Sequence, residues 1–142
     1  TAAVFHRRRP MNKIVARFVD GRILKGFTND FTPAKDRFHV TPDGAALGDE
    51  PTPIKREELK ALFFVKDFKG NPDHKERTDF DPSRAGTGRK IRVVFKDGEI
   101  LIGTTVGYQK GRPGFFLESV DAESNIARCY VVTSATKEIS FV

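Results

Sequence analysis

The sequence has 142 residues, 38% of them hydrophobic and 11% aromatic, which is enough apolar material for one sizeable core or two small ones. Its longest apolar run is Ala61 to Val65, far shorter than the roughly 20 residues of a membrane-spanning helix, and it has no signal-peptide pattern, so we expect no membrane insertion. The single cysteine, Cys129, excludes an internal disulfide and a thiolate metal site, and we expect a cytoplasmic location.

Half of the net charge of +6 comes from one short segment. Residues 13–65 contain nine Lys and Arg against eight Asp and Glu, residues 66–89 contain six against five, and residues 90–142 contain seven against six. The remaining three positive charges are Arg7, Arg8 and Arg9. Residues 1–12 are therefore predicted to be a basic N-terminal arm ahead of a nearly neutral protein.

The first structural unit is predicted at residues 13–65. Ile14, Ala16 and Phe18 alternate with Val15, Arg17 and Val19, a period-two pattern that indicates a strand with one buried face. Asp20 and Gly21 predict a tight turn into a second strand, which contains Gly26 at the position of a bend. A third strand is expected at 37–41, a loop at 41–53, a helical turn at 57–60 and a buried strand at 61–65.

The same plan recurs 77 positions later, at residues 90–142. Residues 90–103 match residues 13–26 at eight of fourteen positions, where about one match is expected by chance. Gly98 takes the place of Gly21 in the turn and Gly103 that of Gly26 in the bent strand. Further strands are expected at 115–120, 127–133 and 137–142. The chain is therefore predicted to be an internal duplication.

Residues 66–89 are rich in Lys, Asp, Gly, Pro, Arg and Ser and are predicted to be a linker. About five short strands in about fifty residues, with a glycine that bends the second strand, favour a small closed barrel over an open sheet. The predicted fold is all-β, with two duplicated five-stranded small barrels joined by the linker.

The repeated motif is apolar-x-Phe-x-Asp-Gly-x-Ile-Leu-x-Gly, at residues 16–26 and 93–103. It resembles the first motif of the Sm-like, SH3-like small β-barrels, a resemblance that covers about three quarters of the chain and implies the fold. In that family, RNA is bound by Asp and Asn in loops after the motif and by an Arg-Gly or Lys-His pair in the last hairpin. The corresponding stretches here, 32–36 and 109–114, contain no Asn, and Arg128 precedes Cys129, so these RNA contacts cannot be assigned.

A second resemblance is to PilZ domains, which bind cyclic di-GMP through an Arg-x-x-x-Arg arm and an Asp-x-Ser-x-x-Gly motif. Residues 81–86 match the second motif, whereas in the arm Arg9 is followed four residues later by Lys13. The duplicated unit also resembles the uncharacterised PilZ-associated domains of bacterial proteins. This resemblance implies a ligand or phosphate site at Arg7, Arg8, Arg9, Asp81, Ser83, Arg84 and Gly86.

Catalysis is not predicted. His6, His39 and His74 have no metal-ligand spacing, and no catalytic triad, phosphate loop or dinucleotide fingerprint is present. Asp20 and Asp97 precede glycine and are explained as turn residues. We expect no enzyme activity, no metal and no cofactor.

Neighbouring phenylalanines in the predicted strands, such as Phe63 and Phe64, must point to opposite faces. We therefore expect the outward ring to be covered by the other unit, with Phe64 and Phe141 in the cores, or to bind a partner. The sequence favours a protein adaptor or assembly subunit that binds protein or self-associates. The alternatives are RNA or single-strand binding and cyclic di-GMP sensing.

Overall fold

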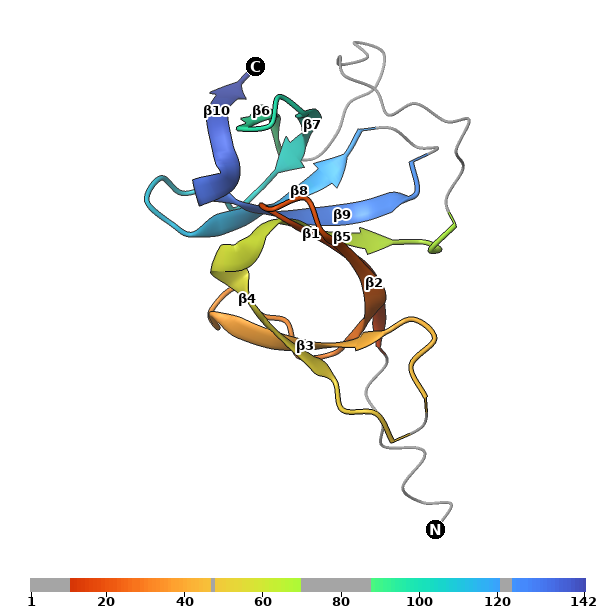
Figure 1. Ribbon diagram of the computed structural model, residues 1–142. Coiled ribbons are helices and arrows are strands. Elements are labelled where there is room, and N and C mark those ends of the chain that lie inside the picture. Colours follow the sequence, from red (N-terminus) through yellow and green to blue (C-terminus); the bar gives the residue numbers. More distant parts are fainter. Residues whose placement is uncertain (1–10, 47, 70–87, 121–123) are drawn as a thin grey trace.

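Ten antiparallel strands form one continuous sheet in the computed structural model, which describes residues 11–46, 48–69, 88–120 and 124–142 (Figure 1). The sheet order is β10-β6-β7-β8-β9-β5-β1-β2-β3-β4. The strands are β1 (Asn12–Phe18), β2 (Ile23–Thr28), β3 (Arg37–Pro42), β4 (Thr52–Lys55), β5 (Leu59–Val65), β6 (Arg89–Phe95), β7 (Ile100–Thr105), β8 (Gly114–Ser119), β9 (Ile126–Val132) and β10 (Thr136–Phe141).

The strand order repeats with the sequence. The order β4-β3-β2-β1-β5 in the first half corresponds to β9-β8-β7-β6-β10 in the second half. The short 3-10 turns before β5 and β10, η2 (Arg56–Glu58) and η3 (Thr133–Ala135), also differ by 77 positions. Even a side-chain contact recurs, because the hydroxyls of Thr28 and Thr105 donate to the carbonyls of His39 and Phe116, each at 2.8 Å.

Four glycines have the same roles in both halves. Gly21 and Gly98 have φ angles of 95° and 92° in the tight turns, a conformation that glycine adopts without steric cost. Gly26 pairs with Ile14 and Pro42, and Gly103 pairs with Ile91 and Ser119. A Cβ at either position would overlap the backbone of the next strand, so the bent strand requires glycine there.

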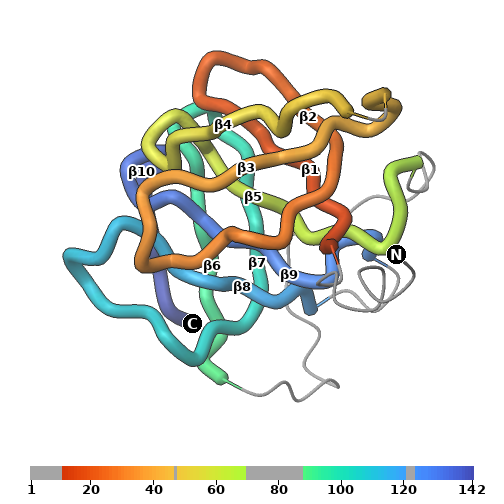
Figure 2. Tube along the Cα trace, turned by 90° about the horizontal axis from the view of Figure 1, so that it is seen from below, coloured from red at the N-terminus to blue at the C-terminus, as the bar shows by residue number. Residues whose placement is uncertain are grey.

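The all-β prediction is confirmed, but two separate closed barrels are not what the sheet forms. β5 pairs with β9, for example Leu62 with Tyr130, and this pairing joins the halves into one sheet. Among the described residues the sheet is open, with β4 and β10 at its two ends. Figures 1 and 2 show the halves side by side along this junction.

One strand was missed by the sequence prediction. β4 lies at Thr52–Lys55, partly inside the stretch expected to be a loop. Pro51 and Pro53 gave that stretch the composition of a loop, although proline is tolerated at the edge of a sheet. The 3-10 turn Arg56–Glu58 replaces the helical turn expected at 57–60.

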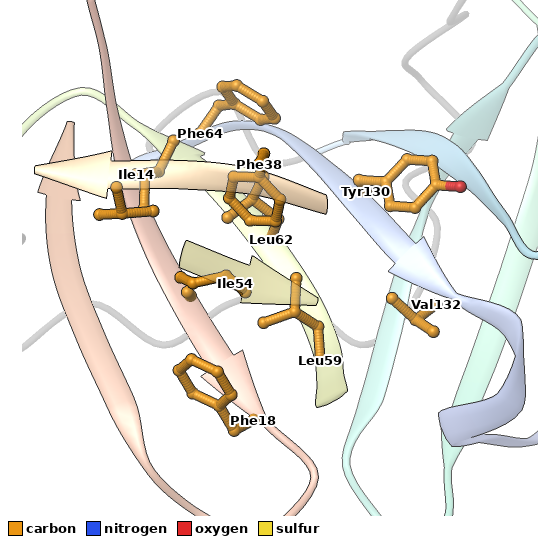
Figure 3. Close-up of a cluster of buried hydrophobic side chains, with 11 residues drawn as sticks. Ile14, Phe18, Phe38, Ile54, Leu59, Leu62, Phe64, Tyr130 and Val132 are labelled. Atoms are coloured by element: carbon orange, nitrogen blue, oxygen red, sulfur yellow. The ribbon is translucent and has the colours of Figure 1, made fainter. Parts of the chain in front are cut away.

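Two hydrophobic clusters fill the two halves, and each contains side chains from the other half. Tyr130 and Val132 of β9 pack into the first cluster, beside Phe38 and Leu62 (Figure 3). Ala61 and Phe63 of β5 pack in return into the second cluster. Because successive residues of a strand face opposite sides, β5 serves both cores at once, and the outward Phe63 is covered by the second half, as expected.

Candidate functional site: the open edges of the sheet

The residues predicted to bind a ligand or phosphate lie outside the described residues. This applies to the whole set, Arg7, Arg8, Arg9, Asp81, Ser83, Arg84 and Gly86. Cyclic di-GMP sensing therefore stays a prediction. Within the part of the chain that is described, no group of His, Cys, Asp and Glu could hold a metal ion.

No helix among the described residues is long and apolar enough to cross a membrane.

The single cysteine is unlike a nucleophile. Cys129 is 1% exposed, and burial raises the pKa of its thiol far above the ordinary value, so the reactive thiolate is disfavoured.

The predicted turn residues Asp20 and Asp97 act as the sequence analysis expected. Each carboxylate accepts a backbone hydrogen bond at 3.0 Å from the residue two positions later, Arg22 or Glu99. In the first half, Arg22 also donates to Asp20 at 2.7 Å through its own guanidinium. In the second half, the residue at that position is Glu99, and the carboxylates bind cations of the first half instead.

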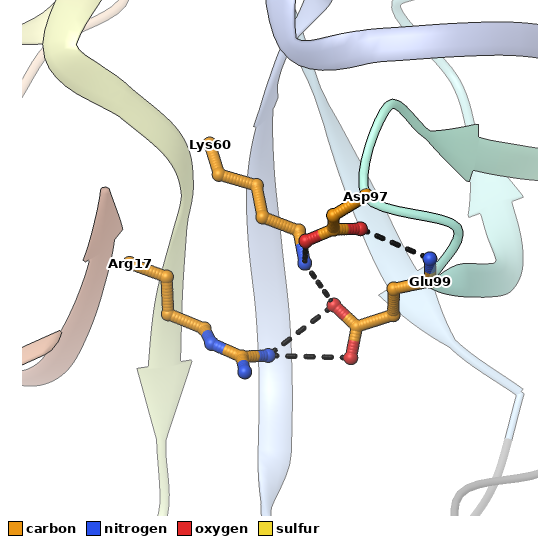
Figure 4. Close-up of polar contacts among 4 residues, drawn as sticks. All are labelled: Arg17, Lys60, Asp97 and Glu99. Carbon is orange, nitrogen blue, oxygen red and sulfur yellow. Dashed lines mark hydrogen bonds and ion pairs between the residues drawn. The ribbon is translucent and has the colours of Figure 1, made fainter. Parts of the chain in front are cut away.

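A polar cluster of Arg17, Lys60, Asp97 and Glu99 connects the two halves (Figure 4). The Lys60 ammonium donates to Asp97 at 2.7 Å and to Glu99 at 2.5 Å, and its side chain is 8% exposed. The Arg17 guanidinium lies 3.2 Å from both oxygens of Glu99. The hydrogen bond from Lys60, followed by that from the Glu99 amide, lowers the pKa of Asp97 below its ordinary value.

This cluster was not predicted from the sequence. Lys60 stands at the start of an apolar strand, and a buried lysine is rare unless it is paired. Its partners are 37 and 39 positions away in the chain. One usable signal was the exchange of Arg22 for Glu99 between two otherwise similar turns.

An apolar hollow of about 590 Å³ lies between loops of the two halves. Pro33 and Ala34 line it from the first half, with Val106, Phe116 and Tyr130 from the second. Of the residues that line it, only Arg112 carries a charge. A nucleic-acid site needs several cations along the phosphate backbone, so this hollow adds no support to RNA binding, which stays a prediction.

Among the described residues, the edge strand β10 has backbone groups without a strand partner. The Val142 amide donates to the Lys90 carbonyl at 3.1 Å, and backbone groups alternate in direction along an antiparallel strand. Ser140 therefore faces β6, whereas the amides and carbonyls of Ile139 and Phe141 point to the open side. At the equivalent places in β5, Leu62 and Phe64 pair with β9.

The burial of side chains also differs between the equivalent strands β5 and β10. Leu62 is 0% and Phe64 6% exposed, since side chains of β9 cover them. Ile139 and Phe141 pack against the second cluster but remain only half-buried. An additional strand beside β10 would complete their burial.

The other edge, β4, is poorly suited to pairing. Arg56 donates to the Asp36 carbonyl at 2.8 Å, so the alternation places the backbone of Pro53 on the open side of the strand. Proline has no amide hydrogen to donate. Pro51, two positions before Pro53, falls on the same side of the alternation and also lacks an amide hydrogen. In the second half, the residues at these positions are Arg128 and Tyr130, which pair with β5.

The model of one protein family matches residues 9–142. No curated protein and no solved structure matches the chain. The matched span includes both halves of the sheet, so the family is defined on the duplicated unit and not on one half. The chain belongs to this family, described as a family of unknown function (DUF6982).

Proposed function

We propose that the protein is a non-catalytic protein-binding module, an adaptor or assembly subunit, that holds a partner polypeptide along β10. The observation that carries this proposal is the contrast between two equivalent strands. Leu62 and Phe64 of β5 are buried beneath β9, whereas Ile139 and Phe141 of β10 are half-buried beside an open edge.

The chemistry of strand addition fits this edge. An added strand gains main-chain hydrogen bonds from the outward amides and carbonyls of the edge, and side-chain contacts supply selectivity. The junction of β5 with β9 is an internal example of such pairing, in which β5 is buried on both faces and β9 is buried from Cys129 to Val132. β10 offers the same backbone pattern, and no strand of the described part of the chain covers it.

We also propose that each half is a strongly bent small barrel of the Sm-like or SH3-like kind. The repeated strand order and the obligatory glycines of β2 and β7 support this interpretation. In Figure 1 the strands of the first half curve around their core. A cytoplasmic location is part of the proposal, because a single buried cysteine suits a reducing compartment.

Peptide display tests the proposed function. Peptides selected on the purified chain are expected to slow hydrogen exchange of the Ile139 and Phe141 amides. Ile139→Pro, which removes an outward amide without removing a bond to β6, should abolish binding, while Ile139→Ala controls for the lost side chain. Selected peptides that protect another region, or that bind Ile139→Pro and Ile139→Ala equally, would show the proposal to be wrong.

A further inference from the structure

We infer that the ligand of β10 is a single extended segment with acidic side chains, supplied by a different protein and not by a second copy of this chain. This inference rests on the proposed function and specifies its ligand. It follows from comparing β10 and β4 with β5 and β9, the strands at the equivalent positions of the internal junction.

The face of β10 that carries Glu138 and Ser140, opposite the face that packs on the second cluster, limits the size of the partner. In β5 this face carries Ala61 and Phe63, which are 0% and 4% exposed because the second half covers them. The equivalent residues of β10 are Glu138 and Ser140, whose side chains hydrogen-bond to each other at 3.1 Å. Burying this polar face against a domain would be costly, so a single strand is the better fit.

The β4 strand of a second copy cannot pair with β10 in the way that β9 pairs with β5 at the internal junction. The β4 edge lacks the outward amides of Pro51 and Pro53. The ion pairs made by Glu99 would also be lost, although Asp20, the equivalent of Asp97, keeps the charge opposite to Lys137. At the junction Lys60 meets Glu99, whereas a copied junction would place Lys137, the equivalent of Lys60, against Arg22, the equivalent of Glu99. Like charges in contact oppose that assembly.

Two registers for pairing of β10 with β10 of a second copy are also unfavourable. In antiparallel strands, a two-fold axis at Glu138 places two glutamates directly opposite each other. An axis at Ile139 places Lys137 opposite Phe141. The Arg89 guanidinium already lies 3.7 Å from the centre of the Phe141 ring, so two cations would meet at each end of the paired strands.

The charge on β10 and its neighbour β6 selects the ligand chemistry. Apart from Lys90, which already has an interaction partner, these strands carry Arg89, Arg92 and Lys137 against one carboxylate, Glu138. Arg92 pairs with Ser140 of the edge strand. Opposite charges across neighbouring strands are stabilising, and acidic residues of an incoming strand would therefore find partners here.

Two synthetic peptides provide the test, one alternating valine with aspartate and one alternating valine with lysine. Fluorescence anisotropy on the whole chain should show the acidic peptide binding at least about tenfold more tightly, with the preference reduced at high salt. The acidic peptide should slow amide exchange at Ile139 and Phe141. Lys137→Glu should reduce the preference, whereas the control Lys35→Glu, in a loop of the first half, should preserve it.

Each outcome has a distinct meaning. Protection of β10 by both peptides with equal affinity would overturn the acidic preference and leave the proposed function standing. If neither peptide, nor any displayed peptide, protects β10, both proposals are wrong. A concentration-dependent dimer in sedimentation that dissociates on Ile139→Pro, but not on Ile139→Ala, would identify a second copy as the ligand and overturn this inference alone.

Discussion

The Lys60 ammonium of the first half lies 2.7 Å from the Asp97 carboxylate of the second half. The same ammonium lies 4.7 Å from the centre of the Phe95 ring. One buried cation therefore connects the two halves next to the strand junction, in a place where sheet pairing alone would leave two carboxylates close together.

Replacing Lys60 with Met should destabilise the fold by about 1–3 kcal/mol. Methionine keeps the apolar stem, but it leaves Asp97 and Glu99 without the shared cation. The free energy of unfolding in urea measures this change. Lys137 is the equivalent residue in β10 and is exposed, so Lys137→Met is the matched control, with an expected change within about 0.5 kcal/mol. Equal losses in the two variants would contradict the structural role of Lys60.

Stability should fall in acid through Asp97. Its pKa is lowered in the folded state relative to the ordinary value of 3.8, chiefly by the hydrogen bond from Lys60. A lowered folded pKa stabilises the protein above the unfolded pKa, and that contribution is lost as the pH falls through the folded pKa. Urea unfolding between neutral pH and pH values below 3.8 should therefore show a decline that is smaller in Asp97→Asn. Parallel declines in both proteins would count against this assignment.

Gly26→Ala should destabilise the protein by about 1–3 kcal/mol or more. The added Cβ would overlap the carbonyl oxygen of Thr41 and approach the Val40 side chain at 2.7 Å, and backbone cannot move aside as a flexible side chain can. Gly107→Ala is the control, because nothing lies within 4 Å of a Cβ at that position. Thermal unfolding of the two variants compares them, and an unchanged Gly26→Ala would mean that β2 and β3 lie farther apart.

The sequence predicted most of the local structure because its signals are local. The turns at Asp20 and Asp97, the bends at Gly26 and Gly103 and most strands follow from alternation and turn chemistry. β4 was missed because its prolines indicate a loop, although they belong to an unpaired edge. Its counterpart β9, with Arg128 and Tyr130 in their place, was predicted.

The joining of the halves could not be predicted in the same way, because strand pairing over long sequence distances leaves no local pattern. Two differences between equivalent positions did contain the information. Ala61 and Phe63 are apolar where Glu138 and Ser140 are polar, which distinguishes a strand buried on both faces from an edge strand. Read together with the prolines of β4, these differences indicate which edges pair and which stay open.

Phe64→Ala and Phe141→Ala should differ in their cost, although both residues were expected in the cores. Phe64 is 6% exposed beneath β9, so its truncation should cost about 3–5 kcal/mol. Phe141 is half-buried at the open edge, so its truncation should cost about 1–2 kcal/mol, in proportion to the smaller apolar area removed. Urea unfolding of both variants measures the difference. Addition of a peptide that binds β10 should raise the cost of Phe141→Ala and leave that of Phe64→Ala unchanged, since only Phe141 would gain a covering strand. Equal costs of Phe141→Ala with and without peptide would argue against burial of this ring in the complex.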